Sequence, residues 1–251
     1  MPEYRRTSTI DARRETVFEW HRRPGAFERL APPWTATRIL GTSGSPPEPG
    51  AEVRLAVRLG PLWRPWTARH EDWEPDHYFT DRQLRGPFGA WHHLHRFVDT
   101  ADGRSELEDV VTYRLPFGPL GQMGAGFARR EIERMFAYRH RVTSGDISSH
   151  TRYGLAPQRI AMTGSSGLVG TALTAFLRGG GHTVTRLVRQ PTPAPDCVAA
   201  TPEGWPGHSL ASVDTVVHLG GENLVFSAPP CLRKGLQIHH RPGVQRGHLR
   251  E

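Results

Sequence analysis

Three glycines spaced three residues apart form the motif in this 251-residue chain that is best suited to chemistry. Gly164, Gly167 and Gly170 lie between a short apolar run and an amphipathic one. Glycine allows a tight turn and a close approach of the backbone to a pyrophosphate, and a following helix directs free N–H groups and the positive end of its dipole at the phosphates. A strand before the motif and a helix after it favour a dinucleotide-binding loop over an ordinary glycine turn. The expected cofactor contacts in this loop are Thr163, Gly164, Ser165, Ser166, Gly167, Leu168, Val169 and Gly170.

The end of the next predicted strand bears on the choice of nucleotide. NAD-binding proteins place an acidic residue there to hold the ribose hydroxyls. This chain instead reads Arg186-Leu187-Val188-Arg189. Arg189 can pair with a 2′-phosphate through its guanidinium fork, which favours NADP over NAD; the alternative is a solvated surface arginine. Leu219 and Gly220, after a further apolar run, complete the predicted cofactor site.

A second group of reactive side chains lies on two alternating runs in the N-terminal part. On the first run Trp91, His93, His95 and Phe97 share one face; on the next, Asp109 and Tyr113 share one face with apolar neighbours. If both faces point inward, they line a cavity for a small, partly polar ligand. Two alternatives stay open, namely acid–base chemistry by a His–Asp pair and a buried polar network without a ligand. We assign no catalytic residue.

A metal site is not expected among the neighbouring histidines. His92, His93 and His95 are close in sequence, but alternation along a strand sends His92 to the opposite face from the other two. The sequence therefore predicts no metal ligand.

The elements that position the N-terminal group follow an α+β order. Asp11 is expected to cap a helix over 12–22, and 26–30 forms a short second helix. A long helix is expected over 127–142, with Phe127 on its apolar side. The predicted strands are 4–10, 52–59, 67–73, 78–84, 90–98 and 107–115. This order indicates a curved antiparallel sheet that wraps the final helix.

The second part of the chain shows a different alternation. Strands are expected at 159–163, 183–188 and 213–219, with a helix at 168–177 after the first, which is typical of a parallel sheet. The polar stretch before them has no apolar period and indicates a linker. The predicted organisation is a domain over 1–146, a linker over 147–157, a partial nucleotide-binding module over 158–224 and an irregular basic tail over 225–251.

Composition and charge exclude several classes of protein. The net charge of +7 is concentrated in residues 226–251, which hold five basic side chains and one acidic one, so the chain lacks the basic stripe of a nucleic-acid-binding domain. The two cysteines, Cys197 and Cys231, have no neighbour at metal or redox spacing. No signal peptide and no apolar run of membrane-spanning length is evident, so no membrane partner is expected and a cytoplasmic location is predicted.

The first domain resembles a known superfamily. The run from Trp91 to Phe97, the Leu107-Glu108-Asp109 and Tyr113-Arg114-Leu115-Pro116 segments and the run from Glu133 to Arg141 are similar to the START-like, helix-grip superfamily, also called SRPBCC or polyketide cyclase/dehydrase-like. The resemblance implies a helix-grip fold and a small-molecule ligand.

Residues 158–224 resemble a second family, the sugar-nucleotide-epimerase-like, atypical extended short-chain dehydrogenases/reductases. The similarity rests on 163–170, Gly181-His182, Leu187-Val188-Arg189 and the run from Val217 to Leu224; Gly220 stands where the family usually has alanine. Some family members carry a helix-grip domain in front, in this order. The expected fold is thus an α+β helix-grip domain followed by a truncated α/β Rossmann-like module.

The same resemblance raises a question about activity. The family uses a Tyr-x-x-x-Lys pair well beyond the glycine loop, whereas the last tyrosine here is Tyr153. We therefore expect a helix-grip ligand-binding domain joined to an incomplete module, with weak or vestigial NADP binding and without complete redox or epimerase activity. The alternatives are an NADP-dependent epimerase- or reductase-like enzyme and a cyclase-like enzyme acting in the N-terminal cavity. The tail, which holds the single lysine Lys234, indicates a shifted reading frame, a gene fragment or a natural disordered tail.

Overall fold

The computed structural model describes residues 1–154, 156–201 and 212–220. Residue contacts divide the chain into two units, residues 1–219 and residues 220–251. Of the second unit, the structure describes Gly220 alone. The predicted tail over 225–251 lies outside the described residues, as do Gly221 to Leu224 of the epimerase-like similarity. Within the described residues, no helix has both the length and the apolar character that crossing a bilayer requires.

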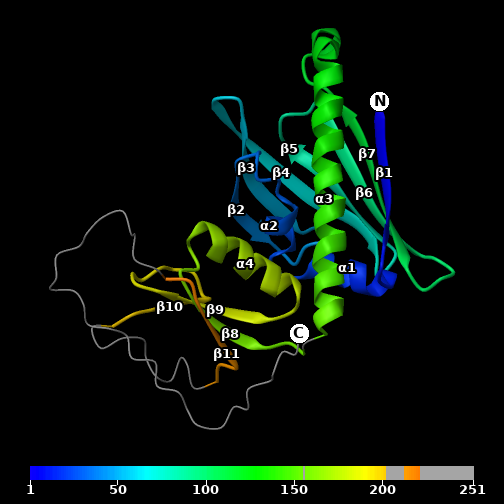
Figure 1. Ribbon diagram of the computed structural model, residues 1–251. Coiled ribbons are helices and arrows are strands. Elements are labelled where there is room, and N and C mark those ends of the chain that lie inside the picture. Colours follow the sequence, from blue (N-terminus) through cyan, green and yellow to red (C-terminus); the bar gives the residue numbers. More distant parts are fainter. Residues whose placement is uncertain (155, 202–211, 221–251) are drawn as a thin grey trace. The chain divides into compact units, whose positions relative to one another are not determined.

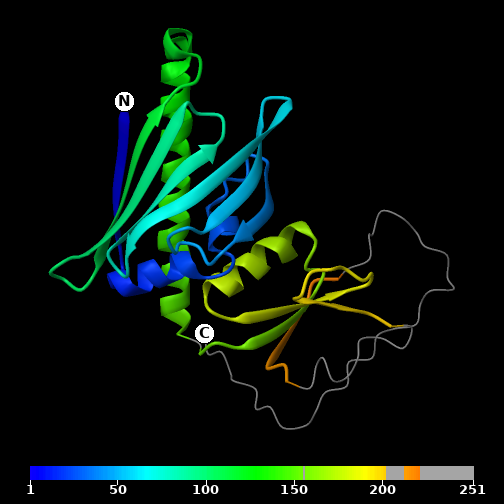
Figure 2. The same ribbon diagram turned by 180° about the vertical axis from the view of Figure 1, so that it is seen from behind.

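The N-terminal residues form one seven-stranded antiparallel sheet (Figures 1 and 2). Its strands pair in the order β1-β7-β6-β5-β4-β3-β2, so the first strand in the chain is an edge strand that pairs with β7. The strands are β1 (Glu3–Ile10), β2 (Thr37–Ser43), β3 (Glu52–Leu59), β4 (Leu62–Glu74), β5 (Tyr78–Arg85), β6 (Ala90–Asp99) and β7 (Ser105–Arg114). Alternation of buried side chains with exposed or half-buried ones along β6 and β7 confirms the predicted strand parity.

One long helix, α3 (Ala125–Tyr153), runs along a face of this sheet (Figure 1). Its buried residues Ile132 and Phe136 pack with Trp91, Val111 and Tyr113 of the sheet. This is the predicted helix-grip arrangement. The expectation that Phe127 joins the apolar side is wrong, because its side chain is 72% exposed. Phe127 precedes Ile132 by five residues, which places it about 140° around the helix from the buried stripe.

Two short helices, α1 (Arg14–Arg22) and α2 (Ala26–Leu30), follow β1. Apolar residues of α1 join the core formed by Ile10, Phe97 and Leu107. The predicted cap by Asp11 is wrong, because the N-cap residue is Arg13 and its side chain makes no capping hydrogen bond. The backbone N–H of Arg14 instead donates to Asp99 Oδ1 at 3.1 Å, so a carboxylate from β6 takes that role.

Helix α3 continues well past the end that the sequence indicates. Residues 147–153, the first part of the predicted linker, are helical. Ile147 is buried in the core, and Asp146 accepts two hydrogen bonds from Arg29 at 2.6 and 2.7 Å. The ring of His150 stacks on Phe176 with centroids 4.3 Å apart. The polar composition of this segment indicated a linker. Its last two turns are nevertheless helical, because one buried apolar side chain anchors them and their polar groups have partners.

The C-terminal described residues form a four-stranded parallel sheet in the order β10-β9-β8-β11. Helix α4 (Leu168–Gly179) connects the first two strands, and Leu173 and Leu177 pack on Ile160, Met162 and Val184. The strands are β8 (Arg159–Thr163), β9 (Thr183–Val188), β10 (Cys197–Ala199) and β11 (Thr215–His218). These pairings confirm the predicted βαβ alternation, while the domain boundaries stay a prediction.

Candidate functional site

The glycine loop joins β8 to α4 in a conformation that requires its glycines. Gly164 has φ +66°, a left-handed conformation that residues with a side chain rarely adopt. A Cβ atom at Gly170 would lie 2.2 Å from the Gly164 carbonyl oxygen, so only glycine fits there. The Gly167 N–H donates to that same oxygen at 3.1 Å, and Thr171 Oγ1 donates to the Ser165 carbonyl at 3.3 Å. The loop is therefore fixed by its own backbone.

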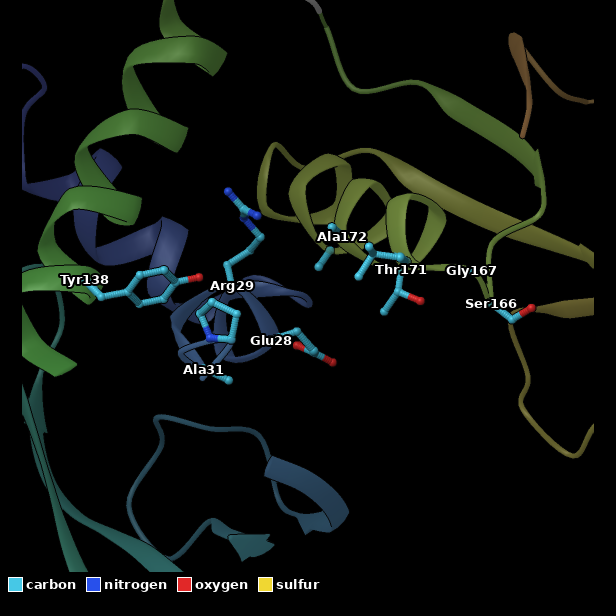
Figure 3. Close-up of a pocket in the computed structure, with 11 residues that line it drawn as sticks. Glu28, Arg29, Ala31, Tyr138, Ser166, Gly167, Thr171 and Ala172 are labelled. Carbon is cyan, nitrogen blue, oxygen red and sulfur yellow. The ribbon is translucent and has the colours of Figure 1, made fainter. Parts of the chain in front are cut away.

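The start of α4 leaves backbone donors available. Ser166 to Val169 are exposed, and Leu168 is 92% exposed although it is a large apolar residue. No side chain caps the helix at Gly167. A pocket of about 360 Å³ opens here, with Ser166, Gly167 and Thr171 in its wall (Figure 3). An anionic group in this position would meet free N–H groups and the positive end of the helix dipole.

The remaining residues of the predicted cofactor site lie at the carboxyl ends of the parallel strands. Thr163 ends β8, and its Oγ1 hydrogen-bonds to His218 Nδ1 of β11 at 2.7 Å. Arg189 directly follows β9, and its side chain is exposed. Leu219 and Gly220 follow β11 in the chain and are also exposed.

An acidic residue that sequence reasoning missed lies beside β9. Asp196 accepts hydrogen bonds from Arg186 at 2.6 and 2.9 Å and from Arg178. Hydrogen bonds from Arg186 first, and then from Arg178, hold the pKa of this carboxyl well below its usual range against the opposing effect of partial burial. Because two arginines already occupy Asp196, it is poorly placed to serve as the ribose-binding acid of an NAD site.

In the helix-grip domain the predicted polar residues are brought together as a buried cluster, which we call the His–Asp cluster: Asp81, His93, His95, Asp109 and His140. Asp109 lies at its centre. His93 Nε2 and His140 Nε2 hydrogen-bond to its two oxygens at 3.1 and 2.9 Å, and His95 Nδ1 lies 2.8 Å from Oδ1. The rings of His93 and His95 have centroids 3.8 Å apart.

The charges of the cluster are strongly coupled. Burial lowers the pKa of His93, but hydrogen bonds to Asp109 and Asp81 outweigh it and raise that pKa to about 9. Burial raises the pKa of Asp109, whereas the charge of His95 and the hydrogen bond from His140 bring it well below its usual value. The Asp81 pKa is likewise lowered by His93 and His95 against burial. The cluster thus brings two carboxylates and three imidazole rings into direct contact with little access to water.

Two further histidines, His21 and His70, lie beside the cluster. Burial, followed by the charge of His95, lowers the pKa of His21 to about 3. Burial also lowers the pKa of His70, which faces Asp81 across the β4–β5 pair. Arg139 of α3 is a further cation nearby, and its pKa is lowered by burial despite the attraction of Asp109 and Asp81.

All six predicted cavity residues are buried on the inner face of the sheet: Trp91, His93, His95, Phe97, Asp109 and Tyr113. His93 contacts the Phe136 ring of α3 with centroids 5.0 Å apart, and Trp91 contacts Phe88 at 4.9 Å. None of the six lines the pocket at the glycine loop or the apolar pocket beside it. These contacts favour the buried-network alternative, and the ligand stays a prediction.

Sequence reasoning missed Asp81, His140 and His70. His140 follows Ile132 and Phe136 at four-residue spacing, which is the one signal that placed it on the buried side of α3. Asp81 lies two residues after the buried Phe79 and so shares its strand face. His92, in contrast, is exposed on the outer face of β6, as alternation predicted.

Part of the chain is similar to curated proteins of an epimerase family. Over 67 residues the chain is 45% identical to an epimerase family protein of Mycobacterium bovis, which covers 26% of this chain and 22% of the relative. Over a segment of the same length it is 37% identical to the epimerase family protein SDR39U1 of Homo sapiens, covering 27% and 22%. The chain thus spans about a fifth of the length of these curated relatives.

A solved structure covers both parts of the chain. It is described as a nucleoside-diphosphate sugar epimerase from Corynebacterium glutamicum, and it is 34% identical with a TM-score of 0.68. The match covers 87% of this chain and 46% of that one. The family described as polyketide cyclase / dehydrase and lipid transport matches residues 10–141, more than half of the chain. With its seven-stranded sheet and long helix, the chain belongs to this polyketide cyclase/dehydrase family.

Proposed function

We propose that the parallel-sheet residues 158–220 are a Rossmann-type module that binds NADP(H), in a protein of the epimerase and short-chain dehydrogenase/reductase class. The observation that carries this proposal is the position of the glycine loop in the strand order. In the order β10-β9-β8-β11, the chain moves from β8 outward on one side and then crosses to β11 on the other. Dinucleotides bind at such a switch point, outside the carboxyl ends of the strands.

The loop geometry supports phosphate as the group bound there. The glycine loop follows the end of β8 at this switch point. It leads through Gly167 into the exposed first turn of α4. The chain is also 45% identical over 67 residues to an epimerase family protein, which supports its assignment to that class.

The preference for NADP over NAD rests on two side chains. Arg189 is exposed at the end of β9, where a 2′-phosphate would lie, and the nearby Asp196 is occupied by Arg186 and Arg178. The exposed guanidinium of Arg189 can pair with the 2′-phosphate that only NADP carries. The Asp196 carboxylate already binds two arginines, so it cannot readily hold the ribose hydroxyls of NAD.

The helix-grip domain is the second part of the proposal. We propose that it binds a small molecule with an apolar body, whose polar end meets His93, His95 and Asp109. Its family description includes polyketide cyclases and lipid transport, which supports a ligand of that kind. Since Phe136 packs on His93, a ligand entering there must displace the Phe136 ring.

Isothermal titration of the full chain with NADPH and with NADH tests the cofactor proposal. We expect NADPH binding with a Kd weaker than about 10 μM, roughly 7 kcal/mol of binding free energy, and weaker binding of NADH. Gly167→Ala should lower NADPH affinity about tenfold, because its Cβ reaches 3.4 Å from the Gly164 oxygen without strain and occupies the phosphate approach. Gly126→Ala is the matched control, since nothing lies within 4 Å of its Cβ position.

Two results would contradict the proposal. One is the absence of heat at about 1 mM NADPH, which corresponds to less than roughly 4 kcal/mol. The other is binding that Gly167→Ala leaves unchanged, because the nucleotide would then bind away from the loop.

A further inference from the structure

Two neighbouring strands, β5 and β6, bring two histidines and a carboxylate together in the helix-grip domain. In the β5–β6 register Asp81 lies opposite His93, and His95 lies two residues further along β6 on the same face. His93 Nδ1 lies 3.2 Å from Asp81 Oδ2, and His95 Nε2 lies 3.6 Å from the same oxygen. One ligand atom from each of the three residues lies within 4.8 Å of the other two. Distances of this size suit three donors around one small cation.

The opposite edges of the same two rings face a second carboxylate. His93 Nε2 hydrogen-bonds to Asp109 Oδ1 at 3.1 Å, and His95 Nδ1 lies 2.8 Å from that oxygen. Each ring therefore lies between Asp81 on one side and Asp109 on the other. A metal-binding histidine usually directs its other ring nitrogen at a carboxylate, which fixes the ring and raises its basicity. Asp109 is placed for that role toward both rings, and His140 Nε2 holds its second oxygen at 2.9 Å.

The surroundings leave coordinating capacity unused. His70 lies opposite Asp81 in the β4–β5 register, and only 9% of it is exposed. Its Nδ1 atom has no hydrogen-bond partner among the described residues. Buried polar atoms are nearly always satisfied, so each unsatisfied one calls for an explanation such as a bound ion.

Two carboxylates face the same pair of histidine rings. Asp109 is buried and Asp81 is half-buried, with side chains 4% and 15% exposed. A metal dication held by the three donors would supply positive charge at the point where both rings meet Asp81. Two imidazoles with one carboxylate suit zinc or iron(II), with a coordination position left open.

We propose that Asp81, His93 and His95 bind one divalent transition-metal ion, of the zinc or iron(II) type, with Asp109 orienting both histidines from behind. This inference is independent of the nucleotide proposal, because it concerns different residues on a different sheet. The predicted absence of a metal site considered His92 with its two neighbours and missed Asp81, which the β5–β6 register supplies in its place.

Cobalt and zinc binding to the full chain test the site. The chain, dialysed against a chelator, should take up Co²⁺ with d–d absorption bands in the visible, and Zn²⁺ should displace it and raise the Tm. Asp81→Asn, which keeps the shape and removes the charge, should abolish the Co²⁺ bands. Asp109→Asn should weaken binding about 10- to 100-fold, as loss of an orienting carboxylate does.

Two controls make the result specific. His92→Ala removes an exposed histidine from the same strand and should leave both metals bound. The double variant His239→Ala/His240→Ala removes the adjacent pair in the tail, which is a competing metal-binding motif. Metal uptake that is lost in this double variant, or that persists in Asp81→Asn, would overturn the proposal.

A further measurement covers the case in which Asp81→Asn does not fold, as near-UV circular dichroism would show. Metal binding by the wild-type chain then tests the proposal. If Zn²⁺ does not raise its Tm and Co²⁺ gives no visible bands, the His–Asp cluster is an ion-pair network without a metal. If both effects appear, His95→Gln, which keeps a polar side chain of similar reach, should remove them.

Discussion

The glycine loop and the His–Asp cluster are built in opposite ways. The loop consists of eight consecutive residues, and its chemistry lies in backbone N–H groups that face solvent. The cluster consists of side chains from β5, β6, β7 and α3, and Asp109 and His140 are 31 residues apart. The loop needs space at each glycine, whereas the cluster needs complementary charges out of water. Substitutions should therefore impair ligand binding at the loop and impair folding at the cluster.

The largest expected effect is on the cluster. Asp109→Ala leaves His93, His95 and His140 without the carboxylate they share, so it should destabilise the fold by about 3–5 kcal/mol in urea unfolding. Glu106→Ala, an exposed position on the same strand, should change stability by less than about 0.5 kcal/mol. A small effect of Asp109→Ala would show that the network contributes little and would remove one side of the comparison.

An intermediate effect is expected at the tightest glycine of the loop. In Gly170→Ala the new methyl group would lie 2.2 Å from the Gly164 oxygen and 2.7 Å from the Ser165 Cα, so the backbone must shift. We expect a loss of about 1–3 kcal/mol of stability together with reduced NADPH binding. Differential scanning calorimetry and titration measure the two effects. If the variant binds NADPH as the wild type does, close packing of the loop is not needed for phosphate recognition.

The smallest effect is expected at the end of β9. Arg189→Met should lower NADPH affinity about tenfold, roughly 1.4 kcal/mol, and leave NADH affinity unchanged. Since Arg189 is exposed, stability should stay within about 0.5 kcal/mol of the wild type. Equal losses for both nucleotides would show that the arginine acts on a group they share, and the NADP preference would need another cause.

Local patterns were reliable wherever neighbours in the chain decide the structure. The inward faces of β6 and β7 follow from alternation, and the strand–loop–helix context around Gly164 follows from the order of apolar runs. The end of α3 was misjudged because Ile147 is buried by distant partners, among them Ile10 and Phe97. The helix cap failed for a similar reason, since Asp99 is 85 residues from the N–H group that it accepts.

The sequence by itself determined the antiparallel and parallel strand patterns, the glycine loop and the inward face that carries His93, His95 and Asp109. The tertiary structure alone decided what those histidines contact. Asp81 joins them through the β5–β6 register and His140 through the packing of α3. Strand pairing and helix packing are non-local, because they depend on which distant surfaces exclude water together, and no short stretch of sequence contains that information.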